Sequence, residues 1–186
     1  MKSFVVFVIA AILTQAGVAQ RQTFVINRDD SQVRMTLKTT HEVVNGTFHI
    51  QSGSIDFDRS SPQMSGLIAV AAGSGKTGNE GRDKKMNKDI LKVGQYATVS
   101  FEPKTYTGAI ALSGDSTIQV TGILTLLGTP HEITVPLLVH LDNASATAKG
   151  HLIVPYVQWG LKNPSFFIWR ADDEVSIDLS LLGEIR

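Results

Sequence analysis

Apolar residues recur at every second position along most of the chain from Phe24 onward. This spacing places them on one face of an extended strand. The runs that show it are Val33, Met35 and Leu37; Ile55 and Phe57; Val99 and Phe101; Ile118 and Val120; and Val175, Ile177, Leu179 and Leu181. The residues between them, such as Arg34 and Thr36, are largely polar. Each strand would thus have one solvent-exposed face and one buried face, which favours antiparallel strands over a parallel sheet buried on both faces.

Turn signals separate these runs at the spacing expected of hairpins. They are Asn45-Gly46, Asp58 to Pro62, Gly114-Asp115, Gly128-Thr129-Pro130 and Asp142-Asn143. The pattern predicts an all-β fold, a meander of about eight strands. Alternation alone does not choose between a two-sheet sandwich and a closed barrel.

One segment, between Asn79 and Val93, breaks the alternation. Met86, Ile90 and Val93 recur there at spacings of four and three among lysine and aspartate residues. This spacing predicts a short amphipathic helix.

The residues just before this helix, 73–77, read GSGKT and resemble the end of a phosphate-binding loop. That motif requires a glycine where this chain has Val70. Gly78 and Gly81 also fall where the first helical turn should form, each at a cost of about 1 kcal/mol relative to alanine. We therefore interpret the segment as a polar connection between a strand and the helix.

Residues 1–19 have the form of a secretory signal peptide. Lys2 precedes an apolar run from Phe4 to Leu13, and the small residues Gly17 and Ala19 suit a cleavage site. We expect cleavage after Ala19 and an exported domain, periplasmic or secreted, of residues 20–186. No later segment approaches the roughly 20 consecutive apolar residues of a transmembrane helix.

Charge and composition exclude several classes of function. The 17 basic and 17 acidic residues balance, which argues against nucleic acid or an anionic membrane surface as the main partner. The absence of cysteine excludes thiol catalysis and thiolate metal sites. The five histidines lack zinc-site spacing, and no Gly-x-Ser-x-Gly elbow is present, so we predict neither a metal site nor an enzyme.

Several motifs occur together in a familiar order. They are Ser31-Gln32-Val33 with His41, Gly46-Thr47-Phe48, Gly53 to Asp58, Gly81-Arg82-Asp83, Ile90 to Val93, Tyr96 to Phe101, Val120 to Gly128, and Pro130 to Pro136. In this order they resemble the YceI-like family of bacterial periplasmic polyisoprenoid-binding proteins, over about Phe24 to Leu182. The chain departs from the family pattern at Lys92, at Ala97 and in the longer segment Trp159 to Ser165.

The resemblance implies an extended, lipocalin-like, eight-stranded antiparallel β-barrel with a short amphipathic helix. It implies a lipid-binding protein that holds an isoprenoid lipid or isoprenoid quinone, requires no cofactor and performs no chemistry. A homodimer is left open. One alternative is an enzyme acting on a bound quinone, which would need a polar pair at the closed end of the lumen. Another is an interaction module with a filled interior.

Under this resemblance, the inward apolar residues are candidates for ligand binding. They are Val33, Met35, Leu37, Phe48, Phe57, Val99, Phe101, Leu124, Leu126 and Ile177, with Met86 and Ile90 at one mouth. The same residues would be apolar in any packed β-domain, so an ordinary core is the alternative.

Two further groups have competing interpretations. For Arg82 and Asp83, we favour structural pairing with strand ends over contact with a lipid head group. For the aromatic residues Trp159, Phe166, Phe167 and Trp169, we favour packing that anchors a long connection over a position at the barrel rim.

Overall fold

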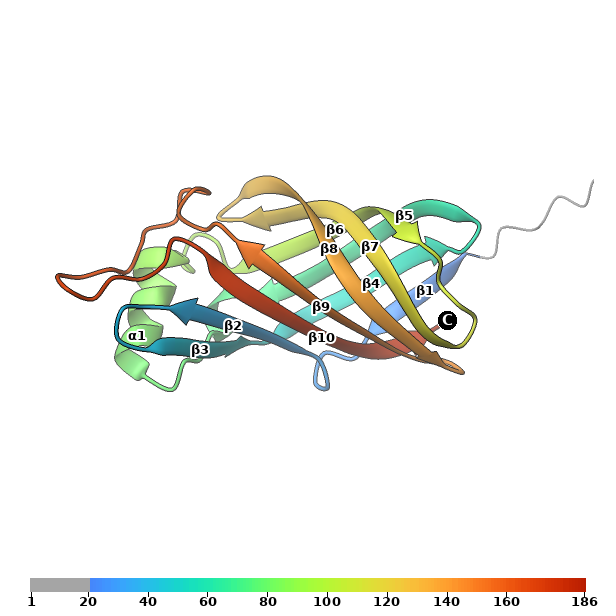
Figure 1. Ribbon diagram of the computed structural model, residues 1–186, viewed down its shortest axis with the longest axis horizontal. Coiled ribbons are helices and arrows are strands. Elements are labelled where there is room, and N and C mark those ends of the chain that lie inside the picture. The colour runs from blue at the N-terminus through green and yellow to red at the C-terminus, as the bar shows by residue number, and fades with distance from the viewer. Residues whose placement is uncertain (1–20) are drawn as a thin grey trace, which may run out of the picture.

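Ten strand segments form one antiparallel sheet that closes on itself (Figure 1). The segments are β1 (Gln22–Ile26), β2 (Gln32–Lys38), β3 (Val43–Phe48), β4 (Ile50–Asp58), β5 (Ser61–Ala71), β6 (Thr98–Gly108), β7 (Gly114–Leu126), β8 (Thr129–Asp142), β9 (Ser145–Val154) and β10 (Val175–Ile185). This computed structural model describes residues 21–186, so the signal peptide expected at residues 1–19 lies outside the described residues.

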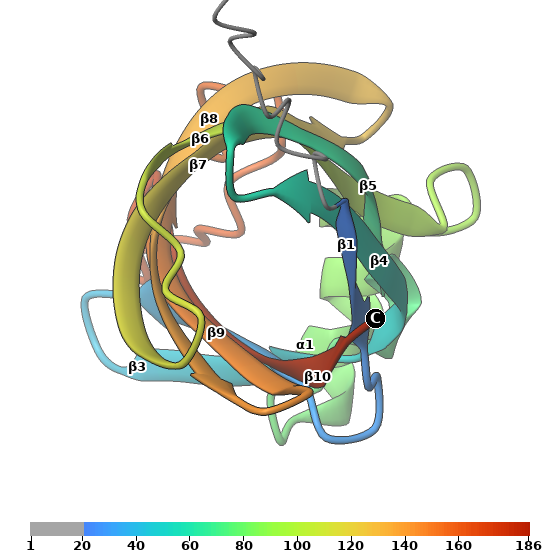
Figure 2. The ribbon, with the colours of Figure 1, turned by 90° about the vertical axis from the view of Figure 1, so that its right-hand side faces the viewer.

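The ten segments occupy eight positions around the barrel. Strand β10 pairs with β2 along its first half and with β1 along its second half. In the same way, β1 pairs with β4 and β2 pairs with β3. Thus β1 and β2 are two parts of one interrupted strand, and so are β3 and β4. The ring β1-β4-β5-β6-β7-β8-β9-β10 confirms the predicted eight-stranded antiparallel barrel (Figure 2).

Polar side chains hold the chain together at both interruptions. Between β1 and β2, the Ser31 hydroxyl accepts a hydrogen bond from the Leu182 amide at 2.9 Å and donates to the Leu182 carbonyl at 3.2 Å. Between β3 and β4, the His49 amide donates to the Ser74 hydroxyl at 2.8 Å. These bonds replace the ladder bonds that the strands lose there.

The helix lies at one end of the barrel, between β5 and β6 (Figure 1). It consists of α1 (Glu80–Lys85) and a wider turn, η2 (Met86–Ile90). The Asn79 side chain caps it by accepting a hydrogen bond from the Arg82 amide at 3.0 Å. Met86 is buried against Met35 and Val44, which confirms the predicted amphipathic helix. None of the helical segments in residues 21–186 is long and apolar enough to cross a membrane.

The glycine-rich segment before the helix has a structural explanation. After a short turn, η1 (Ala72–Ser74), the backbone of Lys76 pairs with Thr47 of β3 through two hydrogen bonds of 2.9 and 3.0 Å. A Cβ atom at Gly75 would lie 2.4 Å from Met86 Cε and 2.7 Å from Phe48 Cε1. The glycine therefore allows the segment to pack closely against the barrel wall and the helix.

Candidate ligand-binding cavity

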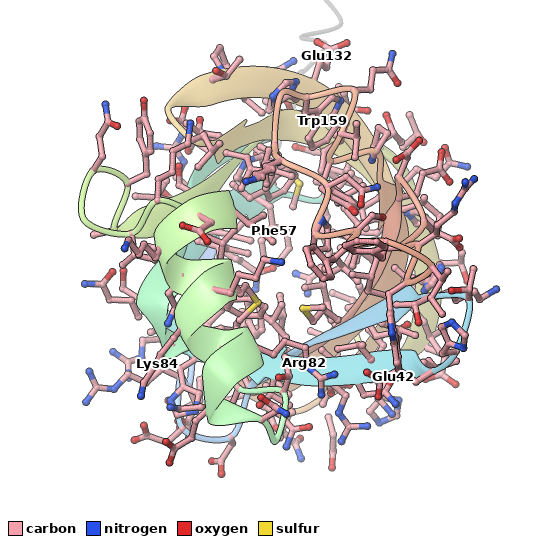
Figure 3. The ribbon with its side chains drawn as sticks, turned by 90° about the vertical axis from the view of Figure 1, so that its left-hand side faces the viewer. Glu42, Phe57, Arg82, Lys84, Glu132 and Trp159 are labelled. Carbon is pink, nitrogen blue, oxygen red and sulfur yellow. The ribbon has the colours of Figure 1, made fainter. Side chains whose placement is uncertain are left out.

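The interior of the barrel is hollow. A cavity of about 560 Å³ extends along it, a size typical of small-molecule sites. Aliphatic and aromatic side chains supply most of its lining. The cavity opens at the end where α1 lies, and Figure 3 looks into this mouth, with Phe57 visible through it.

All twelve residues predicted to bind ligand line this cavity. They are Val33, Met35 and Leu37 of β2, Phe48 of β3, Phe57 of β4, Val99 and Phe101 of β6, Leu124 and Leu126 of β7, Ile177 of β10, and Met86 and Ile90 of η2. The strand alternation turns them inward, because successive side chains point to opposite faces of the sheet. Their contact with a ligand stays a prediction.

The inner end of the cavity is lined with hydrocarbon. Phe24, Phe57, Leu141 and Leu181 are buried there in one cluster. The Tyr106 hydroxyl donates a hydrogen bond of 2.9 Å to the carbonyl of Asp58, the last residue of β4. Burial raises the pKa of Tyr106, so this hydroxyl keeps its proton at neutral pH.

Polar groups gather at the mouth instead. Arg82 Nη1 lies 2.8 Å from Glu42 Oε1, just before β3, and Arg82 Nε donates to the Thr77 hydroxyl at 2.9 Å (Figure 3). Asp83 is buried and accepts hydrogen bonds from the Thr77 hydroxyl at 2.6 Å and the Thr77 amide at 2.9 Å. The bond from the Thr77 hydroxyl is the main cause that lowers the pKa of Asp83.

These contacts resolve the roles expected for the Arg82-Asp83 pair. Arg82 forms the predicted structural ion pair at a strand end, and it also lines the cavity mouth. Asp83 pairs with the preceding loop through Thr77, so its expected pairing with a strand end is wrong. The reason is local: the loop folds back over the first turn of α1 and brings Thr77 to the carboxylate.

The connection between β9 and β10, residues 155–174, contains the aromatic concentration. Trp159 packs as predicted, stacked on His131 with ring centroids 4.0 Å apart. For Phe166 and Phe167 the prediction of packing is wrong, because both are largely exposed, whereas the half-exposed Trp169 packs against the ring of His41. Trp169 also lines the cavity mouth.

Sequence reasoning missed several residues of this connection that reach the cavity. Tyr156 and Leu161 are buried beside the mouth, and Arg170 lines it. The Tyr156 hydroxyl donates to the Asp172 carbonyl at 2.7 Å, which ties the two ends of the connection together. Burial is the main cause that raises the pKa of Tyr156 to about 12. The connection has no regular spacing of apolar residues from which these positions could be predicted.

Two histidines form exposed pairs on the outer face of the barrel. His140 Nδ1 lies 2.6 Å from Asp115, and His151 Nδ1 lies 2.8 Å from Asp178. Within residues 21–186, no three histidine or carboxylate side chains gather as a metal site would require.

The chain is similar to known proteins in sequence and in fold. A UPF0312 protein of Pseudomonas savastanoi pv. phaseolicola is 29% identical over 143 residues, which cover 74% of this chain and 70% of that protein. The structure of BcnA from Burkholderia cenocepacia has a TM-score of 0.67 and 22% identity, and covers 85% of this chain and 99% of its own. The structure of a polyisoprenoid binding domain from Saccharophagus degradans has a TM-score of 0.67 and 15% identity, and the match covers 88% of this chain and 98% of that domain's chain.

The sequence pattern of the YceI-like domain matches residues 24–182, from β1 to β10. This span includes all eight positions of the barrel wall and the helix at its mouth. The chain therefore belongs to the YceI-like domain family.

Proposed function

We propose that this protein binds an isoprenoid-like lipid inside the barrel and shields it from water, without chemical conversion of the lipid. The observation that carries the proposal is the cavity of about 560 Å³, lined with hydrocarbon and open at one end. The Saccharophagus degradans domain of similar fold is a polyisoprenoid binding domain, which supports the same class of ligand here.

Burial of hydrocarbon would supply the affinity. Each methylene removed from water contributes about 0.8 kcal/mol, so a five-carbon isoprene unit contributes a few kcal/mol. Several units outweigh the cost of ordering a flexible chain. Because the inner wall offers aromatic and aliphatic surface, binding would depend on length and width of the chain more than on particular hydrogen bonds.

The distribution of polar groups gives the ligand a direction. The tail would lie against Phe24 and Phe57 at the inner end, and a polar head would lie near Arg82 and Lys85 at the mouth. An isoprenoid quinone or another isoprenoid lipid would fit this polarity. The twelve lining residues predicted from the sequence would then contact the tail.

The same proposal includes export. If residues 1–19 act as a signal peptide, the domain would carry or store its lipid in the periplasm or outside the cell. The interaction-module alternative requires an interior filled by side chains, and the cavity weighs against it.

A binding measurement tests the proposal. The purified protein is stripped of lipid by organic extraction, refolded, and titrated with a fluorescent geranylgeraniol analogue. We expect saturable binding of one probe per chain, and displacement by unlabelled isoprenoid alcohols whose affinity rises with each added isoprene unit until the cavity is full. Refolded protein that shows no saturable binding would contradict the proposal.

A further inference from the structure

Four large apolar residues at the cavity mouth are exposed to solvent. Phe166, Phe167, Ile168 and Trp169 have 67%, 88%, 71% and 49% of their surface accessible. We call Phe166–Trp169 the apolar hairpin. Monomeric soluble proteins rarely expose adjoining apolar side chains of this size, and such patches commonly mark a contact with a protein or a membrane.

Two backbone hydrogen bonds close the apolar hairpin. The Phe166 amide donates to the Trp169 carbonyl, and the Trp169 amide donates to the Phe166 carbonyl, both at 2.9 Å. Phe167 has a φ of 53°, in the left-handed region that favours glycine. A large side chain is thus held at a strained position, where its ring contacts the Phe166 ring edge-on, with centroids 5.0 Å apart, but stays largely exposed.

Contacts at its base fix the apolar hairpin to the turn between β2 and β3. The Thr40 hydroxyl donates to the Ile168 carbonyl at 3.1 Å, and the Thr40 amide donates to the Arg170 carbonyl at 2.9 Å. The ring of Trp169 lies 4.3 Å from that of His41. The connection that carries the hairpin projects beyond the end of the barrel, on the side of α1 (Figure 1).

The apolar hairpin and the cavity mouth share one end of the molecule. Trp169 and Arg170 line the mouth, and Lys85 of α1 donates to the Pro164 carbonyl at 3.3 Å. A surface that touched the hairpin would therefore also face the opening through which a lipid enters.

The charged side chains that line this mouth are mostly basic. Within the described chain, the charged side chains that line the cavity are Glu42, Arg82, Lys85 and Arg170. Glu42 and Arg82 neutralise each other, which leaves the positive charges of Lys85 and Arg170. After the hairpin, Asp173 accepts a hydrogen bond from Asn163 at 2.7 Å at the base of the connection. Asp172 and Glu174, its neighbours in the chain, are exposed as well and do not line the cavity, so the positive excess is confined to the side chains around the opening.

We propose that this end docks on the surface of an anionic phospholipid membrane. The apolar hairpin enters the interface between head groups and acyl chains, where tryptophan and phenylalanine are favoured. Lys85 and Arg170 face the anionic head groups. The mouth then opens onto the bilayer, so that a lipid tail passes between membrane and cavity without crossing water. The proposal of membrane docking depends on the apolar hairpin and the basic side chains alone. The proposal of lipid transfer also rests on the proposed function.

Vesicle flotation tests the docking. Large vesicles of phosphatidylethanolamine and phosphatidylglycerol are compared with vesicles of phosphatidylcholine. The wild-type protein and all variants begin at the same residue, which mass spectrometry verifies. The wild-type protein should float with the anionic vesicles and less with the neutral ones. F167S/I168S should lower the partition coefficient by about tenfold or more, because two apolar side chains no longer enter the bilayer.

A matched control removes an apolar side chain elsewhere. Leu112 is 81% exposed in the turn between β6 and β7, at the opposite end of the barrel. L112S should float as the wild type does. The proposal is overturned if the wild type stays unbound with both kinds of vesicle, or if F167S/I168S floats equally well. A dimer in solution that F167S/I168S dissociates, without flotation of the wild type, would identify a second copy as the occupant.

A second pair of measurements separates docking from lipid binding. F167S/I168S should bind the geranylgeraniol probe at equilibrium as the wild type does, but take it up from anionic vesicles at least several times more slowly. Equal uptake rates would overturn the transfer role. Flotation of a wild-type protein that binds no probe would sink the proposed function and leave the docking in place.

Discussion

The Arg82 guanidinium lies 2.8 Å from the Glu42 carboxylate and links the helix to the beginning of β3 at the cavity mouth. The same guanidinium donates to the hydroxyl and to the carbonyl of Thr77, at 2.9 and 3.1 Å. Arg82 therefore joins three segments of the chain, whereas, among the described residues, the half-exposed Glu42 side chain makes a single ion pair, with Arg82.

This asymmetry predicts unequal effects of removing either partner. Glu42→Gln should lower the free energy of unfolding by less than about 1 kcal/mol, as for most exposed ion pairs. Arg82→Ala should cost about 1–3 kcal/mol, because it also removes both bonds to Thr77. Urea unfolding at pH 7 measures both values. Equal losses in the two variants would show that the bonds to Thr77 contribute nothing.

Asp83 should make stability depend on pH in the acid range. Its pKa in the folded state lies below the usual value of 3.8, mainly because of the hydrogen bond from the Thr77 hydroxyl. The stabilisation is fully present above the unfolded pKa and is lost as pH falls through the folded pKa. Unfolding free energies between pH 2 and pH 6 should therefore decline more gently in Asp83→Asn than in the wild type.

Thr77→Val provides the control for this effect, because it removes the hydroxyl donor and keeps the carboxylate. The pKa of Asp83 should then rise towards 3.8, which two-dimensional NMR titration of the side-chain carboxyl can follow. An unchanged pKa would exclude the Thr77 hydroxyl as its main cause.

The glycines around the helix should respond in opposite ways to alanine. Gly75→Ala places a Cβ atom 2.7 Å from Cε1 of the Phe48 ring, and we expect a loss of about 1–3 kcal/mol through overpacking. Gly81→Ala meets only the Asn79 side-chain oxygen at 3.4 Å and should stabilise α1 by about 1 kcal/mol. Thermal unfolding would decide the matter: a tolerated Gly75→Ala would contradict the close packing described here.

Filling the cavity should shorten the ligand that fits. Ala148 is buried and lines the cavity, so Ala148→Phe would occupy space that a lipid tail uses. We expect this variant to lose affinity for long isoprenoid alcohols by more than tenfold and to keep most of its affinity for short ones. Ala144→Phe, in the exposed turn between β8 and β9, is the control and should bind both as the wild type does.

Much of the barrel could be predicted because it depends on local spacing. The alternation of Val33, Met35 and Leu37 is enough to place them on one face, and closure of the sheet turns that face inward. The choice of a barrel over a sandwich came from the family resemblance, since alternation is the same in both. The residues lining the cavity follow from these two facts.

The mouth could not be predicted in the same way. Its arrangement depends on contacts between distant segments, such as Lys85 with Pro164 and Thr40 with Ile168. Phe167 is exposed, whereas aromatic residues are usually buried, so the aromatic content of this connection wrongly predicts packing at this position. The interruption between β1 and β2 likewise depends on the hydrogen bonds between Ser31 and Leu182, 151 positions away in the chain.

Native mass spectrometry of the protein, purified without detergent from the cells that make it, tests the central claim most directly. The account predicts a bound mass that disappears on denaturation and reappears in the organic extract as an isoprenoid lipid. A chain that is empty under native conditions, and that stays empty after incubation with isoprenoid lipids, would contradict it.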